Sequence, residues 1–356
     1  MKSSSDVEKS NLEIDLEMHN LVGAKPKKEE GAYHRFCLAL DEHVSIKTLM
    51  RMWGPRLEFF VRLMLVATFL DDSIRTMMEF PQLSTQIAQQ GCLRWMVSGA
   101  PQLAQFFAAI FLGVGLLAEL GGSLCLLFLT YPNAATLALI GWTIVQPVMF
   151  AQLSNFMMLA ESLSLLGGLL MLRTHLVYDP FNVQIQLAGR ILLPVTYLYY
   201  AGLFLFSALT LDETNSYAAF MSSLSEFVLN IFVLVGLVIG STLIAFGLKS
   251  RLVALTLAIL NLCFVMYRHP FFRYIWIENG EWKYDEDNMP LPHVSLGEDV
   301  TAFDFDAKEI YDLHKYYFFL GLSTSGALLL LTQLGPGEIA AESDEVILPA
   351  MTRALD

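Results

Sequence analysis

Long blocks of apolar residues recur along this chain, and they constrain its fold more than any other feature. Residues 106–129 and 316–334 are examples, each carrying few charged side chains. A helix of about 18 or more apolar residues is long enough to cross the roughly 30 Å hydrocarbon core of a bilayer. Because 55% of the residues are apolar and only 16% are charged, the sequence predicts an all-α polytopic membrane protein without a soluble catalytic domain.

We expect about eight transmembrane helices, several of them short or interrupted. The expected spans are residues 57–70, 106–129, 134–151, 156–172, 191–211, 227–246, 252–266 and 316–334. Pro147 is expected to kink the third span. The chain then divides into a polar, largely disordered tail (1–56), a first membrane half (57–172), a second membrane half with an acidic loop at 267–315 (173–334), and a C-terminal tail (335–356).

The distribution of Lys and Arg predicts the orientation, because basic loops stay on the cytosolic side. The segment through Arg56 holds nine Lys or Arg residues, and the loop after the sixth span holds Lys249 and Arg251. The loop 267–315 holds eleven acids against five basic residues. With eight spans, the basic segments share one side, so we expect both termini in the cytosol and the acidic loop in the lumen.

The two membrane halves resemble each other, which suggests two parallel four-helix repeats. Arg62-Leu-Met-Leu opens the first half as Arg190-Ile-Leu-Leu opens the second. Ala135-Thr-Leu-Ala-Leu matches a stretch that begins at Ala254, and Leu166-Gly-Gly-Leu-Leu matches Ser325-Gly-Ala-Leu-Leu. Apolar segments also resemble one another by composition alone, so chance similarity is the alternative explanation.

Several functional classes lack support in the sequence. The net charge of −13 has the wrong sign for a protein that neutralises nucleic-acid phosphates. The four cysteines are scattered, the histidines show no ligand spacing, and no nucleophile elbow, P-loop, dinucleotide fingerprint or HExxH motif is present. We therefore predict no catalytic residue, no metal site and no cofactor.

Two acids within spans, Glu119 and Glu161, are the first candidates for function, because a carboxylate in hydrocarbon is costly. One interpretation is a water-filled pocket between helices that receives a charged group of a ligand. The other is that each acid is protonated, or pairs with Arg62 or Arg190 to fix helix packing. Both interpretations place the acids inside the bundle.

Asp71 and Asp72 directly follow the first span and offer a second candidate site. They are expected either to cap the next helical turn or to bind a cation, such as the free amino terminus of a peptide. The acidic loop 267–315 interleaves acids with aromatic residues. It is either a solvated insertion or a segment that covers a lumenal pocket or binds basic cargo.

Four segments of the chain resemble the surfeit locus protein 4 family of multi-spanning cargo receptors. They are Val61–Arg75, Leu187–Leu193, Phe246–Leu257 and Leu328–Gly337. The closing Leu-Gly-Pro-Gly also resembles the smaller four-span DoxX-like proteins, which agrees with the suspected repeat.

The resemblance implies a receptor in the endoplasmic reticulum membrane that cycles to the Golgi. It would bind soluble secretory proteins in the lumen, often near their amino termini, and load them into COPII-type vesicles; a homo-oligomer is left open. By position, the resemblance assigns Asp71, Asp72 and Arg75 to cargo binding. It assigns Arg190 to a mid-chain motif, and Lys249 and Arg251 to a cytosolic loop. The family's lysine-rich ending is replaced by Met351–Asp356, and Glu161 stands where a basic residue is expected.

Two other functions remain open from the residues alone. A solute transporter is suggested by the intramembrane acids and the repeat, and it predicts flux that depends on Glu119 or Glu161. A DoxX-like component of a membrane redox complex predicts a bound quinone or flavin.

Overall fold

The structure, a computed structural model, describes residues 46–91, 93–94, 99–177, 181–209, 217–278, 281–284, 307–335, 337 and 339. Residues 1–54 and 55–356 form separate units, and the fold below is that of the second. Within the tail 1–56 and the tail 335–356, most of the residues lie outside the described ones.

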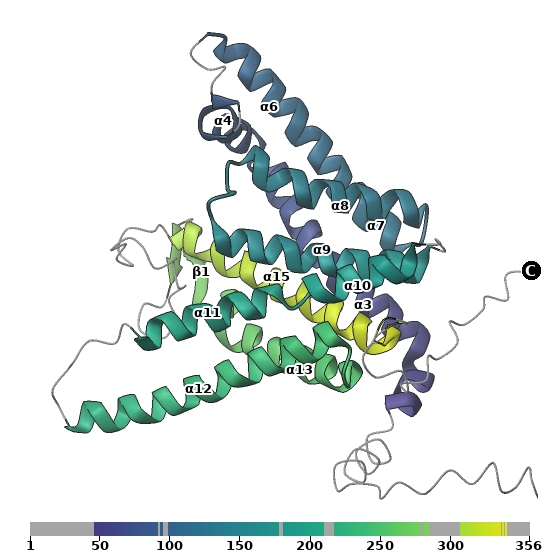
Figure 1. Cartoon of the computed structure of the whole chain (residues 1–356). Coiled ribbons are helices and arrows are strands. Elements are labelled where there is room, and N and C mark those ends of the chain that lie inside the picture. Colours follow the sequence, from purple (N-terminus) through teal and green to yellow (C-terminus); the bar gives the residue numbers. More distant parts are fainter. Residues whose placement is uncertain are drawn as a thin grey trace, which may run out of the picture. The chain divides into compact units, whose positions relative to one another are not determined.

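The described residues fold into a bundle of helices with one small hairpin (Figure 1). The first half contains α3 (Ile46–Met78), α4 (Phe80–Gln90), α6 (Pro101–Leu116), the π-helical turn η1 (Leu117–Gly121), α7 (Gly122–Leu127), α8 (Pro132–Met149) and α9 (Phe156–Leu176). The second half contains α10 (Asn182–Leu192), α11 (Val195–Leu209), α12 (Tyr217–Phe246), α13 (Ser250–Arg268), α14 (Phe271–Tyr274), the antiparallel strands β1 (Ile275–Glu278) and β2 (Glu281–Tyr284), and α15 (Ala307–Leu334).

Four of these segments are long and apolar enough to cross a bilayer: Pro101–Leu127, Phe156–Leu176, Ser250–Tyr274 and Ala307–Leu334. The chain is therefore an all-α, multi-pass membrane protein, as the sequence predicted. Each of the eight expected spans overlaps a helix, but a total of eight crossings stays a prediction.

Several helix boundaries differ from those predicted. Asp71 and Asp72 lie inside α3, which continues to Met78, so the predicted capping role is wrong. The expected fifth span is divided at Leu193 and Pro194 into α10 and α11, because proline cannot donate the backbone hydrogen bond that a continuous helix needs. The last helix begins at Ala307, nine residues before the expected start at Tyr316.

The repeat stays a prediction, and the turns that join α7 to α8 and α12 to α13 agree with it. Leu129 and Tyr131 have positive φ angles of 55° and 48°, and the corresponding Gly247 and Lys249 have angles of 73° and 47°. The backbone hydrogen bonds also correspond: Thr130 donates to Cys125, and Leu248 donates to Leu243, each at 2.9 Å. Two turns of the same unusual conformation at corresponding places indicate a duplicated helical hairpin.

Side-chain packing fixes the register of this repeat. A methyl group added at Gly122 would lie 3.0 Å from the Leu139 side chain, and one added at Gly240 would lie 3.2 Å from the Leu257 side chain. The two pairs have the same spacing in the sequence. Leu139 therefore corresponds to Leu257, which shifts the sequence match by one residue.

The first and last helices of the halves show a second set of matching contacts. Ser164 of α9 donates a hydrogen bond to the Leu193 carbonyl, and Ser323 of α15 donates one to the Met64 carbonyl. A methyl group at Gly167 would lie 2.6 Å from the Leu193 nitrogen. At the matching Gly326, it would lie 2.8 Å from the Leu65 nitrogen. Hence α3 packs on α15 as α10 and α11 pack on α9.

Helices α9 and α15 meet each other through a pseudo-two-fold contact (Figure 1). The Tyr316 hydroxyl reaches the Met158 sulfur and the Tyr317 hydroxyl reaches the Met157 sulfur, so corresponding residues exchange partners. A methyl group at Gly168 would lie 2.7 Å from the Cβ of Ala327, its own counterpart. Such reciprocal contacts are those of an isologous dimer interface. They join matching ends of α9 and α15, as parallel repeats require.

Candidate functional site

The candidate site begins at the π-helical turn η1 between α6 and α7. Glu119 lies in this turn and is only 1% exposed. Single π turns inside α-helices occur frequently at functional sites, because the extra residue redirects the side chains around it. The corresponding helix of the second half, α12, is α-helical from Tyr217 to Phe246. The π turn therefore distinguishes the first half from its repeat.

Glu119 and Asp72 form a pair of carboxyl groups between α3, η1 and α8. Trp142 donates its indole N–H to Glu119 Oε1 at 2.5 Å, and Gln146 donates its amide to Asp72 Oδ2 at 2.9 Å. Trp142 and Gln146 lie one turn apart on α8, so this helix brings the two carboxyl groups to the same wall.

This pair lines a cavity of about 350 Å³ enclosed by helices of both halves. Its charged lining residues are Asp72, Arg75, Glu119, Glu309 and Asp312. Its uncharged polar lining residues are Thr68, Thr76, Trp142, Thr143, Gln146, Gln152, Ser162, Tyr316 and Tyr317. Because four acidic side chains face one arginine, the cavity favours a cationic group.

Two ion pairs tie the N-terminal turns of α15 to Asp71 on α3 and to Glu79, the residue that directly follows α3. Lys315 lies 2.6 Å from Asp71, and Lys308 lies 2.7 Å from Glu79. Asp71 does not line the cavity. It lies one residue beyond the expected first span, where burial raises the pKa of its carboxyl while the Lys315 ammonium opposes that shift. Of the neighbouring acids predicted to bind cargo, the structure therefore brings Asp72 to the cavity and gives Asp71 to a helix–helix ion pair.

Glu161 is the second predicted intramembrane acid, and it is not among the cavity residues. It is 2% exposed, and its Oε1 accepts a hydrogen bond of 3.4 Å from the Tyr200 hydroxyl. Its Oε2 has no hydrogen-bond partner among the described residues. The next residue, Ser162, does line the cavity. The structure thus separates the two acids that the sequence grouped together.

Of the predicted basic residues, Arg75 lines the cavity, whereas Arg62, Arg190, Lys249 and Arg251 do not. Arg62 donates to the Glu58 carbonyl and lies 4.0 Å from its carboxylate. It precedes Asp72 on α3 by about 15 Å of helical rise. Arg190 donates to the Ile339 carbonyl at 2.5 Å, and Arg251 lies against Gly335. Lys249 precedes α13. Neither predicted acid–arginine pairing, to Arg62 or to Arg190, is among the contacts of Glu119 and Glu161.

The repeat provides an internal comparison for the cavity. In the register fixed above, Glu119 corresponds to Leu237, Trp142 to Leu260, Gln146 to Phe264, and Asp72 to Tyr200. The second half thus replaces the hydrogen-bonding residues by apolar or aromatic ones. Packing of a helical repeat does not require the polar residues, so the polar cavity is a specialisation of the first half.

Sequence reasoning missed several residues of the cavity. Trp142 and Gln146 are polar groups within an apolar span, and this signal was available in the sequence. Glu309 and Asp312 were assigned to the acidic loop because four charged residues precede Tyr316. The ion pairs of Lys315 with Asp71 and of Lys308 with Glu79 explain why α15 begins with charged residues before its apolar part.

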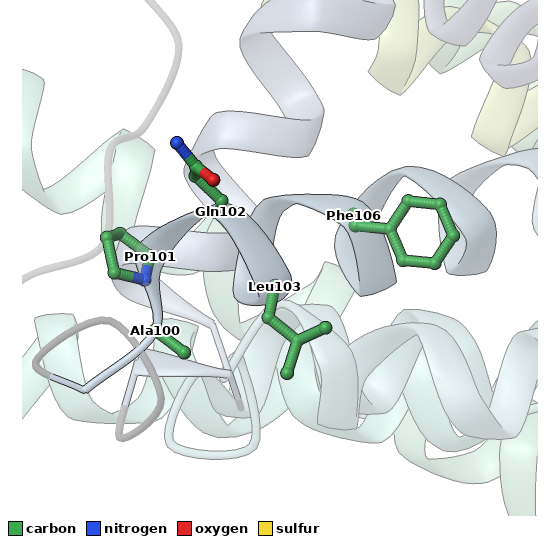
Figure 2. A pocket seen from close by; sticks show the side chains of 5 residues that line it. All are labelled: Ala100, Pro101, Gln102, Leu103 and Phe106. Atoms are coloured by element: carbon green, nitrogen blue, oxygen red, sulfur yellow. The ribbon is translucent and has the colours of Figure 1, made fainter.

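A second hollow, of about 440 Å³, lies at the start of α6 (Figure 2). It is lined by Ala100, Pro101, Gln102, Leu103 and Phe106. All five residues come from one helix end, and none is charged. This hollow is therefore a surface feature of α6, and it offers no group that would orient a ligand.

Comparison with known proteins identifies the family of this chain. The family model described as "SURF4 family" matches residues 39–284. The surfeit locus protein 4 homolog of Drosophila melanogaster is 24% identical over 300 residues, covering 79% of this chain and 87% of that protein. No solved structure matches the chain. The matched residues include α3, η1, α8 and α9, so the chain belongs to the SURF4 family.

Proposed function

We propose that this protein is a cargo receptor of the endoplasmic reticulum. It binds soluble secretory proteins in the lumen, loads them into COPII-type vesicles and cycles between the endoplasmic reticulum and the Golgi. Its mechanism is binding and coat coupling rather than catalysis. The family membership supports this proposal, and the cavity around Asp72 and Glu119 is the single observation on which it depends most.

The chemistry of the cavity suits a cationic part of a cargo protein. The α-amino group at the start of a polypeptide is a small cation with several N–H donors. Asp72 and Glu119 accept hydrogen bonds, and Glu309 and Asp312 add negative charge. An entering ammonium group would offer each of the two carboxyl groups a charged hydrogen-bond donor.

The expected topology puts the cavity on the side where cargo is found. The acid pair lies towards the C-terminal end of α3, beside the start of α15 and therefore close to the acidic loop. Lys249 and Arg251 belong to a loop assigned to the cytosol. If basic loops stay on the cytosolic side, Lys249 and Arg251 face the vesicle coat and the cavity faces the lumen.

A pulse-chase experiment in cells depleted of the protein tests this function. Soluble secretory proteins should reach the Golgi late, as measured by glycan processing, while membrane proteins travel at the normal rate. The wild-type chain and Glu161→Gln should restore transport. Asp72→Asn combined with Glu119→Gln should fail at equal abundance.

The transporter remains the second candidate, because one buried carboxylate oxygen of Glu161 has no hydrogen-bond partner among the described residues. Its test is solute flux in reconstituted vesicles. Flux that Glu161→Gln abolishes, together with normal secretion in depleted cells, would replace the receptor by a transporter.

A further inference from the structure

The segment after α13 carries apolar side chains for which helix packing does not account. Helix α13 has 19 residues, and its length of about 28 Å matches the hydrocarbon core. His269 and Pro270 end it, and α14 and the β1–β2 hairpin follow without further linker. A hairpin that begins this soon after a spanning helix lies close to the membrane surface.

One face of this segment packs against the start of α15. Ile275 is 8% exposed and packs with Ile310. The ring of Trp282 lies 4.8 Å from that of Tyr311, and Phe271 contacts both Tyr311 and Phe318. These contacts fix the hairpin on α15 and determine which side chains remain outside.

Apolar side chains outside this contact are exposed. Trp276 points to the opposite strand face from Ile275, opposite Lys283 on β2, and is 45% exposed; Phe272 of α14 is 60% exposed. On α13, Phe264, Met266 and Tyr267 are also exposed, so the apolar surface continues from the spanning helix onto the hairpin. Water would be a poor solvent for such a continuous surface.

Charged side chains in this segment suit the same environment. Lys283 pairs with Glu278 at 2.8 Å, and the Arg273 guanidinium lies 5.3 Å from the centre of the Tyr274 ring. Tryptophan and tyrosine concentrate at the headgroup level of bilayers, and long basic side chains extend from there to the phosphates. Aromatic and basic residues therefore occur here in the combination that the interface favours.

We propose that α14 and the β1–β2 hairpin lie in the headgroup layer, with Phe272 and Trp276 inserted among the upper acyl chains and the charged groups beside Trp276 at the level of the headgroups. The lipid surface is the occupant of this face, because the face continues the surface of a spanning helix. Through Ile310 and Tyr311, the leaflet also supports the turn of α15 that carries Glu309 and Asp312. This proposal does not depend on the cargo-receptor function.

Quenching of tryptophan fluorescence by brominated phosphatidylcholine tests the proposal in full-length protein reconstituted without cargo. The signal of Trp276 is obtained as the difference between wild type and Trp276→Phe, a change that keeps the side chain apolar. We expect this difference signal to be quenched more strongly by bromines near the glycerol end of the acyl chain than by bromines near its methyl end. It should be protected from aqueous iodide.

Trp282→Phe is the matched control, because Trp282 belongs to the same hairpin but packs on Tyr311. This variant should keep the quenching by shallow bromines. A Trp276 signal that iodide quenches as it quenches free tryptophan, and that bromolipids leave unchanged, would overturn the proposal and make this face available to a protein partner.

Discussion

The indole N–H of Trp142 satisfies one oxygen of a carboxyl group that is almost completely buried. A buried acceptor that loses its donor costs about 1–3 kcal/mol. The repeat shows that a leucine occupies the corresponding place when no carboxyl group is nearby. The role of Trp142 therefore depends on Glu119, because the indole supplies the hydrogen bond that this buried carboxyl group needs. When Glu119 is replaced by an apolar residue, the indole N–H is no longer required.

Trp142→Phe should lower the free energy of unfolding by about 1–3 kcal/mol, because Glu119 then lacks its donor. Thermal unfolding in detergent measures this loss. Trp276→Phe is the control, since that ring is exposed, and it should leave stability unchanged. Combining Trp142→Phe with Glu119→Leu should recover stability; a double variant that is no better than the single one contradicts the account.

At the scale of helices, α9 and α15 approach each other closely. Gly168 permits this approach, because a larger residue there would meet both Ala327 and Leu65. The ion pairs of α15 with Asp71 and Glu79 also hold α15 in place. The packing against α9 and the ion pairs therefore both fix the position of α15, which forms one wall of the cavity.

Gly168→Ala should lower the free energy of unfolding by about 1–3 kcal/mol, because its methyl group overpacks the helix seam. Gly113→Ala is the matched control, since nothing lies within 4 Å of a methyl group added there. Thermal unfolding of the two variants should differ in this sense. Equal stability of both would show that α9 and α15 are not packed as described.

Asp71→Lys alone and Lys315→Asp alone should each lower the free energy of unfolding by about 1–2 kcal/mol, between the values of exposed and buried ion pairs. The double variant restores a pair of opposite charges and should regain most of the loss. A double-mutant cycle of unfolding measurements gives the coupling. Additive losses would mean that the pair does not join α3 to α15.

At the scale of the molecule, the sequence predicted the helical membrane fold, while the repeat stays a prediction with which the matching turns agree. Hydropathy and short matches such as Arg62 with Arg190 carry that information locally. The cavity was predicted only in part, because hydropathy does not report which helices meet. Glu119 was recognised from its cost in a span, but its contact with Asp72 depends on the π turn and on packing between α3 and α8.

The early start of α15 was missed for a related reason. Residues 307–315 are too polar for a span, and their helix is stabilised by partners on α3 that lie far away in the sequence. Charge alone therefore suggested a loop.

The eight-span topology predicts which segments meet the lumen. An engineered glycosylation site within residues 285–306 should be modified, and sites introduced before residue 46 or after residue 340 should stay unmodified. Mobility shifts that an endoglycosidase reverses provide the measurement. Glycosylation of either tail would contradict cytosolic termini, and glycosylation of one tail alone would also contradict an even number of spans.

The central claim is that cargo enters the cavity beside Asp72 and Glu119, and photo-crosslinking tests it most directly. A photoreactive amino acid placed at Thr143, within the cavity, should form adducts with soluble secretory proteins in cells. The same residue at Thr242, exposed on α12, is the control and should form none. The adducts at Thr143 should disappear when Asp72→Asn and Glu119→Gln are combined. Absence of cargo adducts at Thr143, or equal adducts at both positions, would contradict the account.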